Sequence, residues 1–241
     1  MASKPILIAC AGRTFPGISA RLGDFDNWIA DGLGEHLPVT TLDIREADTL
    51  PAADTLAGVV VTGSHSMVSD REPWSERAAD WLRALIGAGV PILGICYGHQ
   101  LLAHAFGGRV DYHPGGIEIG TADVTLLEQA RDDALFGDTA PRFAVQLVHR
   151  QSVLALPEAA VLLARGEHEP HQAFRIGACA WGVQFHPEFS ATAMRCYIAQ
   201  MADVLTGQGR DQAALAAEVR DTPQATALLS RFAKIAAHAQ Q

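Results

Sequence analysis

The amino-acid sequence predicts an α/β protein with an open, doubly wound and mostly parallel central sheet flanked by helices. Two observations lead to this fold class. Short apolar runs alternate with longer segments of helical periodicity through the first hundred residues. The run Gly58–Thr62 (GVVVT) is apolar on consecutive residues, which is typical of a parallel strand buried on both faces. At 241 residues and 49% hydrophobic content, the chain is long enough to bury such a core.

Three strands are expected in the first quarter of the chain, each a short run of apolar or β-branched residues. They lie at Ile6–Cys10, Val39–Asp43 and Gly58–Thr62. Glycine and proline predict a loop at Ala11–Ser19, and helical periodicity predicts a helix near Asp26–Leu37. This alternation is what a parallel sheet with crossover helices requires.

A helix and a further buried strand follow. After a loop at Gly63–Trp74, the pattern predicts a helix from about Ser75 to Gly87 and a strand at Ile92–Ile95. The pattern becomes helical again at Gln100, and a Gly-Gly pair stops it.

The rest of the chain changes to short strands and turns, and then to helices. The expected strands are Gly116–Leu126, Arg142–Val148, Val161–Arg165, Gln172–Arg175 and Ala178–Gln184. From Thr192 onward the pattern is helical, with turn signals near Gly207–Gly209 and Thr222–Pro223. We therefore expect a flavodoxin-like sheet with a small antiparallel segment over residues 1–206, and a C-terminal helical extension over residues 207–241 packed on the same domain.

Composition excludes several classes of function. The formal net charge of −9, with no cluster of Lys and Arg, argues against nucleic acid as a partner. No segment is long enough for a membrane span or a signal peptide, so we expect a cytoplasmic protein. The cysteines are widely spaced, without a CxxC pair, and resemble neither a zinc site nor a disulfide framework. They are Cys10, Cys96, Cys179 and Cys196.

The segment Pro91–Gly108 (PILGICYGHQLLAHAFGG) places Cys96 at the turn between an expected strand and helix. Gly94 and Gly98 flank the cysteine two positions to either side, as in a nucleophile elbow, where glycines relieve crowding in a sharp turn. The positive end of the helix dipole favours a reactive thiolate. Most free cysteines are small buried apolar residues, which suits the other three, but that role does not explain the two glycines.

His186 and Glu188 supply a candidate base and its orienting carboxylate. They follow the apolar run WGVQF, and residues two apart on an extended segment project from the same face. Glu188 can therefore address one ring nitrogen of His186 while the other faces a nucleophile. The alternative is a buried histidine that only ends a strand, but the cysteine elbow in the same chain favours a triad.

Three further residues can complete such a site. The backbone N–H groups of Gly63, just after a strand, and Tyr97, just after the cysteine, are placed as an oxyanion hole requires. Gly63 taken alone is equally well an ordinary turn glycine. Gln100 lies one helical turn beyond Cys96 and can face the same cleft, although without the elbow a helix-surface glutamine is the better interpretation.

The remaining histidines give weaker signals. His149 ends an expected strand and can approach the site, but its spacing alone does not show this. His168 and His171 form an HxxH pair in a proline-containing loop, where solvated histidines are more common than metal ligands.

Together, LGICYGHQLLAHAFGG, VVVTGSHSMVSDREPW and WGVQFHPEFS resemble the class I glutamine amidotransferases, over nearly the whole chain. The resemblance implies that Cys96 is the nucleophile and that His186 is the general base and acid, with Glu188 as its partner. It also implies oxyanion donors at Gly63 and Tyr97, and substrate contacts from the side chains of Gln100 and His149. No metal or cofactor is required.

Two departures from the family pattern matter. Thr62-Gly63-Ser64 stands where Gly-Gly-Pro is frequent in the family, and Val148-His149-Arg150-Gln151 stands where many members have S-H-x-D. The missing aspartate affects either recognition of the substrate's α-amino group or a contact with a partner.

The implied reaction is hydrolysis of the side-chain amide of L-glutamine through a γ-glutamyl thioester on Cys96, which releases ammonia. Three interpretations remain open: a glutaminase that supplies ammonia to a separate synthetase subunit, an independent hydrolase of γ-glutamyl amides or peptides, and a catalytically silent regulatory subunit. The intact set of Cys96, His186 and Glu188 argues against the third.

Overall fold

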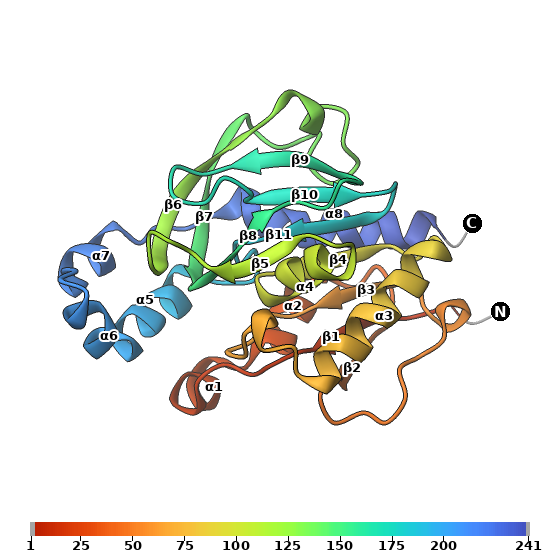
Figure 1. Ribbon diagram of the computed structural model, residues 1–241, viewed down its shortest axis with the longest axis horizontal. Coiled ribbons are helices and arrows are strands. Elements are labelled where there is room, and N and C mark those ends of the chain that lie inside the picture. The colour runs from red at the N-terminus through yellow and green to blue at the C-terminus, as the bar shows by residue number, and fades with distance from the viewer. Residues whose placement is uncertain (1–2, 240–241) are drawn as a thin grey trace.

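The computed structural model describes residues 3–239, and these form a twisted sheet between two layers of helices (Figure 1). Within this range the main sheet has nine strands in the order β2-β1-β3-β4-β11-β10-β9-β6-β7. The first five are parallel to one another. Their bounds are β1 Ile6–Cys10, β2 Val39–Asp43, β3 Gly58–Val61, β4 Ile92–Ile95 and β11 Ala180–Val183.

The sheet continues beyond β11 with antiparallel strands. They are β10 Ala173–Ile176, β9 Ala160–Arg165, β6 Glu118–Leu126 and β7 Arg142–His149. A separate antiparallel pair is formed by β5 (Arg109–Tyr112) and β8 (Gln151–Ala155). Short 3-10 turns occur at Ala53–Thr55, Val68–Asp70 and Glu128–Ala130.

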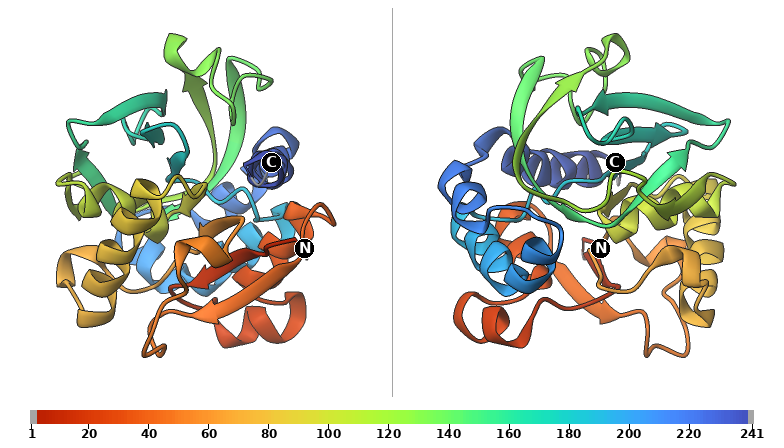
Figure 2. Two further views of the ribbon diagram at one scale, coloured as in Figure 1. Left: turned by 90° about the vertical axis from the view of Figure 1, so that its right-hand side faces the viewer. Right: turned by 60° about the vertical axis from the view of Figure 1, so that its left-hand side comes forward.

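Helices cover both faces of the parallel half, because its central strands are apolar on consecutive residues. One face packs against α2 (Phe25–Leu33) and α8 (Pro223–His238), and the other against α3 (Pro73–Gly87) and α4 (Tyr97–Ala105). Figure 2 shows α8 and α3 on opposite sides of the sheet. The buried residues of β3 divide between the two faces, as a doubly wound sheet requires, with Val60 in one cluster and Val59 and Val61 in the other.

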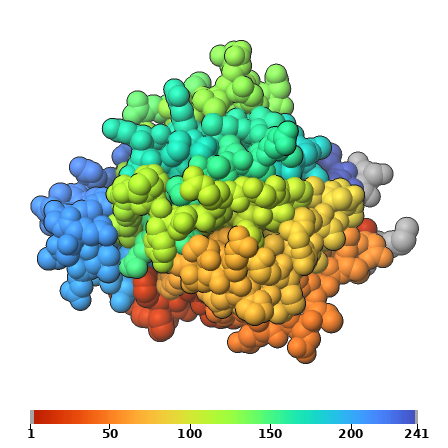
Figure 3. Space-filling model, viewed as in Figure 1, coloured from red at the N-terminus to blue at the C-terminus, as the bar shows by residue number. Residues whose placement is uncertain are grey.

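Four further helices gather near the carboxyl ends of the parallel strands. They are α1 Pro16–Leu22, α5 Ala191–Gln200, α6 Ala202–Gly207 and α7 Gln212–Glu218. A third apolar cluster joins them, with Ile18 of α1 and Tyr197 of α5 among its members. Figure 3 shows that the blue segment, which holds α5 to α7, forms one end of the molecule.

The expected fold class is confirmed, with several local differences. The first loop contains α1, which begins at Pro16, a residue that suits the first turn of a helix. The helix expected to reach Leu37 ends at Leu33, because Gly34 follows with φ of 70°. The strands β5 and β8 were not expected. The division of the chain at residue 206 stays a prediction.

Candidate active site

Cys96 lies on a strained turn between β4 and α4. Its φ of 50° and ψ of −96° are unusual for a residue with a side chain, and it forms the N-cap of α4. The two flanking glycines permit this turn. A Cβ on Gly94 would lie 2.4 Å from the carbonyl oxygen of Gly98, and one on Gly98 would lie 2.5 Å from the carbonyl oxygen of Val61. Neither position can hold a larger residue without movement of the backbone.

The sheet order brings three loops to this turn. β4 lies between β3 and β11, so residues just after each of these strands meet at the carboxyl edge of the sheet. The Cys96 N–H donates to the carbonyl oxygen of Val183 at 2.9 Å, which fixes the end of β4 against β11. Cys96 and His186 line the same pocket, and Gly63 adjoins both side chains.

His186 and Glu188 form a buried pair. Nδ1 of His186 lies 2.7 Å from Oε1 of Glu188, and the two side chains are 2% and 0% exposed. The other ring nitrogen, Nε2, is buried and has no hydrogen-bond partner among the described residues. Burial lowers the pKa of His186, but the charges of Glu188 and Cys96 outweigh burial and raise it to about 10.

Gly63 and Tyr97 hold backbone amides near the cysteine, because Tyr97 directly follows it and the Gly63 loop lies against it. Within residues 3–239, neither of these amides donates a hydrogen bond. A Cβ on Gly63 would lie 3.0 Å from Cε1 of His186 and 3.8 Å from Cβ of Cys96, so this loop lies close to both side chains. The Tyr97 phenol extends away to Ser75 Oγ at 2.7 Å, and burial raises its pKa.

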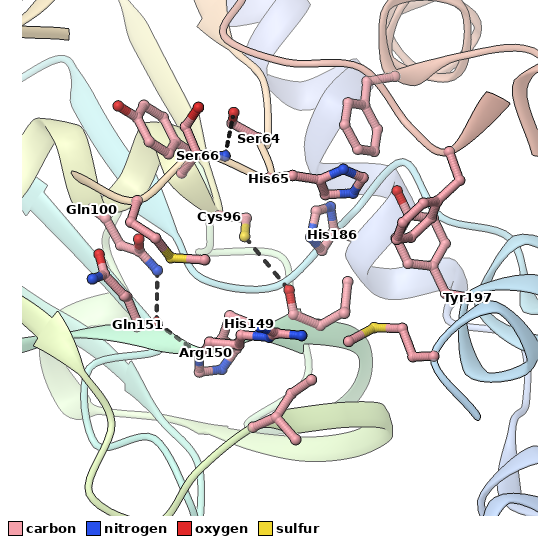
Figure 4. Close-up of a pocket in the computed structure, with 17 residues that line it drawn as sticks. Ser64, His65, Ser66, Cys96, Gln100, His149, Arg150, Gln151, His186 and Tyr197 are labelled. Carbon is pink, nitrogen blue, oxygen red and sulfur yellow. Dashed lines mark hydrogen bonds between the residues drawn. The ribbon is translucent and has the colours of Figure 1, made fainter. Parts of the chain in front are cut away.

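Gln100 lies on the wall of the pocket and is almost fully buried. Its Nε2 donates to the carbonyl oxygen of Gln151 at 2.7 Å (Figure 4). The same atom donates to Oε1 of Gln184 at 3.0 Å. Gln151 itself is tied to Ser69, because its Nε2 donates to Ser69 Oγ at 2.5 Å. The amide nitrogen of Gln100 is therefore engaged within the protein, and its Oε1 is the atom left to contact a ligand.

His149 also lines the pocket, but both of its ring nitrogens have partners in the protein. Nδ1 donates to the carbonyl oxygen of Gln151 at 2.9 Å, and Nε2 lies 2.9 Å from Oε2 of Glu118. Glu118 also accepts from Gln172 at 3.3 Å. His149 is thus part of a buried polar network beneath the pocket, and any contact it makes with substrate uses the edge of its ring.

The pocket has a volume of about 270 Å³ and includes residues that sequence reasoning did not single out. Phe15, His65 and Tyr197 form one wall: the ring centroids of Phe15 and His65 are 4.4 Å apart, and those of Phe15 and Tyr197 are 5.3 Å apart. Arg150 contributes an exposed cationic side chain. His65 lies only two residues after Gly63, which could have indicated it, whereas Phe15 and Tyr197 carry no such signal.

Other reactive side chains lie outside this pocket. All four cysteines are free, and burial raises the pKa of Cys10 to about 12. The rings of His168 and His113 contact each other at a tilt, with centroids 4.0 Å apart, while His171 Nδ1 donates to the carbonyl oxygen of Val153 at 2.6 Å. Over the described part of the chain, no group of three or more His, Cys, Asp or Glu side chains is placed to hold a metal ion.

A doubly wound sheet with a cysteine on a strand–helix turn, beside a histidine–carboxylate pair, has the arrangement expected of the class of α/β enzymes that hydrolyse through a thiol. Comparison with known families agrees with this class and narrows it. The family model described as "Glutamine amidotransferase class-I" matches residues 25–202. The chain belongs to the class I glutamine amidotransferase family.

Known relatives point to one branch of that family. A protein named as a glutamine-hydrolyzing GMP synthase, from Aeropyrum pernix, is 37% identical over 158 residues, which cover 66% of this chain and 28% of that protein. The chain thus spans less than a third of that longer relative. A protein named as one subunit of a glutamine-hydrolyzing GMP synthase, from Methanopyrus kandleri, is 34% identical over 164 residues, which cover 66% of this chain and 77% of that protein.

Solved structures agree on the fold. A glutamine amidotransferase from Thermotoga maritima superposes with a TM-score of 0.76 at 21% identity, covering 97% of this chain and 99% of that one. A glutamine amidotransferase from Methylobacillus flagellatus gives 0.74 at 28% identity, covering 99% and 94%.

Proposed function

We propose that this chain hydrolyses the side-chain amide of L-glutamine through a γ-glutamyl thioester on Cys96. The observation that carries the proposal is the position of Cys96. It lies on a strained elbow and lines the same pocket as His186, whose Nδ1 is hydrogen-bonded to Glu188. This is the nucleophile, base and orienter arrangement that covalent amide hydrolysis needs.

In the first half of the reaction, the Cys96 thiolate attacks the amide carbon of glutamine. The developing oxyanion accepts hydrogen bonds from the Gly63 and Tyr97 amides, which have no other acceptor among the described residues. The C–N bond then breaks as protonated His186 gives its proton to the departing NH2 group, which leaves as ammonia. The raised pKa of His186 supports this role, because the ring is protonated at neutral pH.

In the second half, water cleaves the thioester. Neutral His186 takes a proton from the water as it attacks the thioester carbon, which releases glutamate and restores the Cys96 thiolate. Glu188 holds the His186 ring throughout and balances its positive charge. Gln100, through its free oxygen, and the ring edge of His149 contact the glutamine.

The ammonia has a proposed destination. The similarity to a protein named as one subunit of a GMP synthase favours a glutaminase that supplies ammonia to a synthetase partner in the cytoplasm. Over the described residues, no helix has both the length and the apolar character needed to cross a bilayer. An independent γ-glutamyl hydrolase is the second candidate, and the aromatic wall of the pocket favours it.

The test is glutamate release from L-glutamine by the wild-type protein and by Cys96→Ala. Cys179→Ala is the matched control, because Cys179 lies at the opposite end of β11 from the site. We expect loss of activity only in Cys96→Ala, and a wild-type adduct with the mass of one glutamyl group on Cys96. Activity that survives Cys96→Ala would refute the mechanism. A rate that rises only when a synthetase is added would favour the role of ammonia supplier.

A further inference from the structure

The pocket is chemically different on its two sides. Figure 4 shows Gln100 and Gln151 on one side of Cys96, and His65, His186 and Tyr197 on the other. The glutamine side presents amide groups. The histidine side carries an aromatic wall that no step of the proposed reaction uses.

Three segments that are distant in sequence build this aromatic wall of Phe15, His65 and Tyr197, and Met201 lines the pocket with it. Phe15 precedes α1, and His65 follows β3. Tyr197 lies in α5, and Met201 is the C-cap residue of that helix. Tyr197 is fixed by a 2.7 Å hydrogen bond between its hydroxyl and Thr14 Oγ1. Because Thr14 directly precedes Phe15, this bond ties two of the three segments together and makes the wall a preformed surface.

The reaction geometry directs the leaving group toward this wall. The amine must receive its proton from Nε2 of His186, since Nδ1 is bound to Glu188. His186 and His65 line the same pocket, and the charge of His186 lowers the pKa of His65. A substituent on the departing nitrogen therefore emerges beside His65 and Phe15, while the glutamyl part remains near Gln100.

The wall also suits an uncharged apolar group. Burial lowers the pKa of His65, and the neighbouring charge of His186 lowers it further, although Asp24 acts in the opposite direction. His65 is thus a neutral aromatic ring at neutral pH. Phe15 and Met201 add apolar surface, and ammonia alone makes no use of it.

We propose that the aromatic wall binds the amine substituent of a γ-glutamyl amide, so that the site also hydrolyses γ-glutamyl amides of aromatic or apolar amines. This inference rests on the proposed function, because it uses the same thioester. The sulfur of Cys96 bonds to the γ-carbonyl carbon, and the C–N bond breaks as protonated His186 gives its proton to the departing nitrogen, which leaves as a neutral amine. Water then releases glutamate as before.

Three substrates test the inference on the whole chain: L-glutamine, γ-glutamyl methylamide and γ-glutamyl anilide. Each is measured as kcat/KM with wild type, Phe15→Ala and Phe106→Ala. Phe106 is the matched control, because it is also a partly buried phenylalanine but lies at the end of α4, outside the pocket. Comparing the same substrates across variants cancels the different intrinsic reactivity of their amide bonds.

We expect Phe15→Ala to lower kcat/KM for the anilide about tenfold more than for glutamine or the methylamide. Phe106→Ala should change all three alike. Phe15→Leu keeps the apolar volume without the ring and serves if the alanine variant does not fold. The inference is overturned if the wild type hydrolyses glutamine but not the anilide, or if Phe15→Ala lowers all three equally. If no substrate gives Cys96-dependent glutamate release, the proposed function itself fails.

Discussion

The substitution Gly98→Ala tests the geometry of the elbow most directly. The added methyl group would lie 2.5 Å from the carbonyl oxygen of Val61 and 2.8 Å from its Cβ. Ordinary contacts of a Cβ begin at 3.4 Å, so the closest contact is short by 0.9 Å (3.4 minus 2.5). The carbonyl oxygen of Val61 is a backbone atom of a central strand, so it cannot move aside as the end of a flexible side chain can.

The displacement has consequences for both stability and catalysis. Overpacking of this kind costs about 1–3 kcal/mol of unfolding free energy. Val61 precedes Gly63 by two residues, and Tyr97 directly precedes Gly98, so moving α4 from β3 separates the two proposed oxyanion amides. A misplacement of about 1 Å in such a site lowers the rate by about 10²-fold.

Glutamate release and urea unfolding measure the two effects separately. Gly87→Ala is the control, because Gly87 lies in α3 and a Cβ there meets nothing within 4 Å. That variant should keep wild-type activity and gain up to about 1 kcal/mol of stability. If Gly98→Ala stays within about threefold of wild-type activity, the close approach of α4 to β3 does not position the site.

Three further predictions concern the charged groups. Glu188→Gln removes the carboxylate that raises the pKa of His186. We expect a lower His186 pKa by NMR titration and a fall in glutamate release of about 10²–10⁴-fold. An unchanged His186 pKa would contradict the pairing of Glu188 with His186. Because the folded-state pKa of His186 lies above its ordinary value of 6.5, the stability that this residue contributes is fully present below that pH and is lost as the pH rises toward 10. The stability advantage of wild type over His186→Gln in urea should therefore shrink across this range, and a constant difference would count against it. Asp133→Ala leaves Arg175 and the indole N–H of Trp181 without their buried acceptor and should cost about 3 kcal/mol by urea unfolding, whereas a loss under about 1 kcal/mol would mean that water replaces the carboxylate.

Local sequence signals were sufficient for the parallel half of the fold. The run at Gly58–Thr62 is buried and apolar because both faces of its strand are covered, and this information lies in consecutive residues. β5 was not predicted because Arg109–Tyr112 is largely exposed and lacks an apolar run. β8 was not predicted because its first two residues, Gln151 and Ser152, are polar although they are buried, so the strand lacks a continuous apolar run. Its partner in the small sheet is β5, which was not predicted either.

The site divides in the same way. The two glycines around Cys96 are local, and the close contacts that a Cβ would make at Gly94 and Gly98 give the physical reason for their presence. The place of Phe15 and Tyr197 in the pocket depends on how the loop before α1 packs against α5, which no short spacing encodes. The engagement of both ring nitrogens of His149 likewise depends on Glu118, a residue on the neighbouring strand.

The position of β4 between β3 and β11 has a consequence for the newly made chain. β11 begins at Ala180, so β4 has an open edge until 84 further residues (180 minus 96) have been synthesised after Cys96. At ribosomal speeds of about 5–20 residues per second, this interval lasts roughly 4–17 s. During that time an apolar strand edge is exposed to other chains. Until the segment carrying β11 and His186 leaves the ribosome, the nascent protein is therefore open to aggregation at this edge, and Cys96 lacks the histidine proposed as its base.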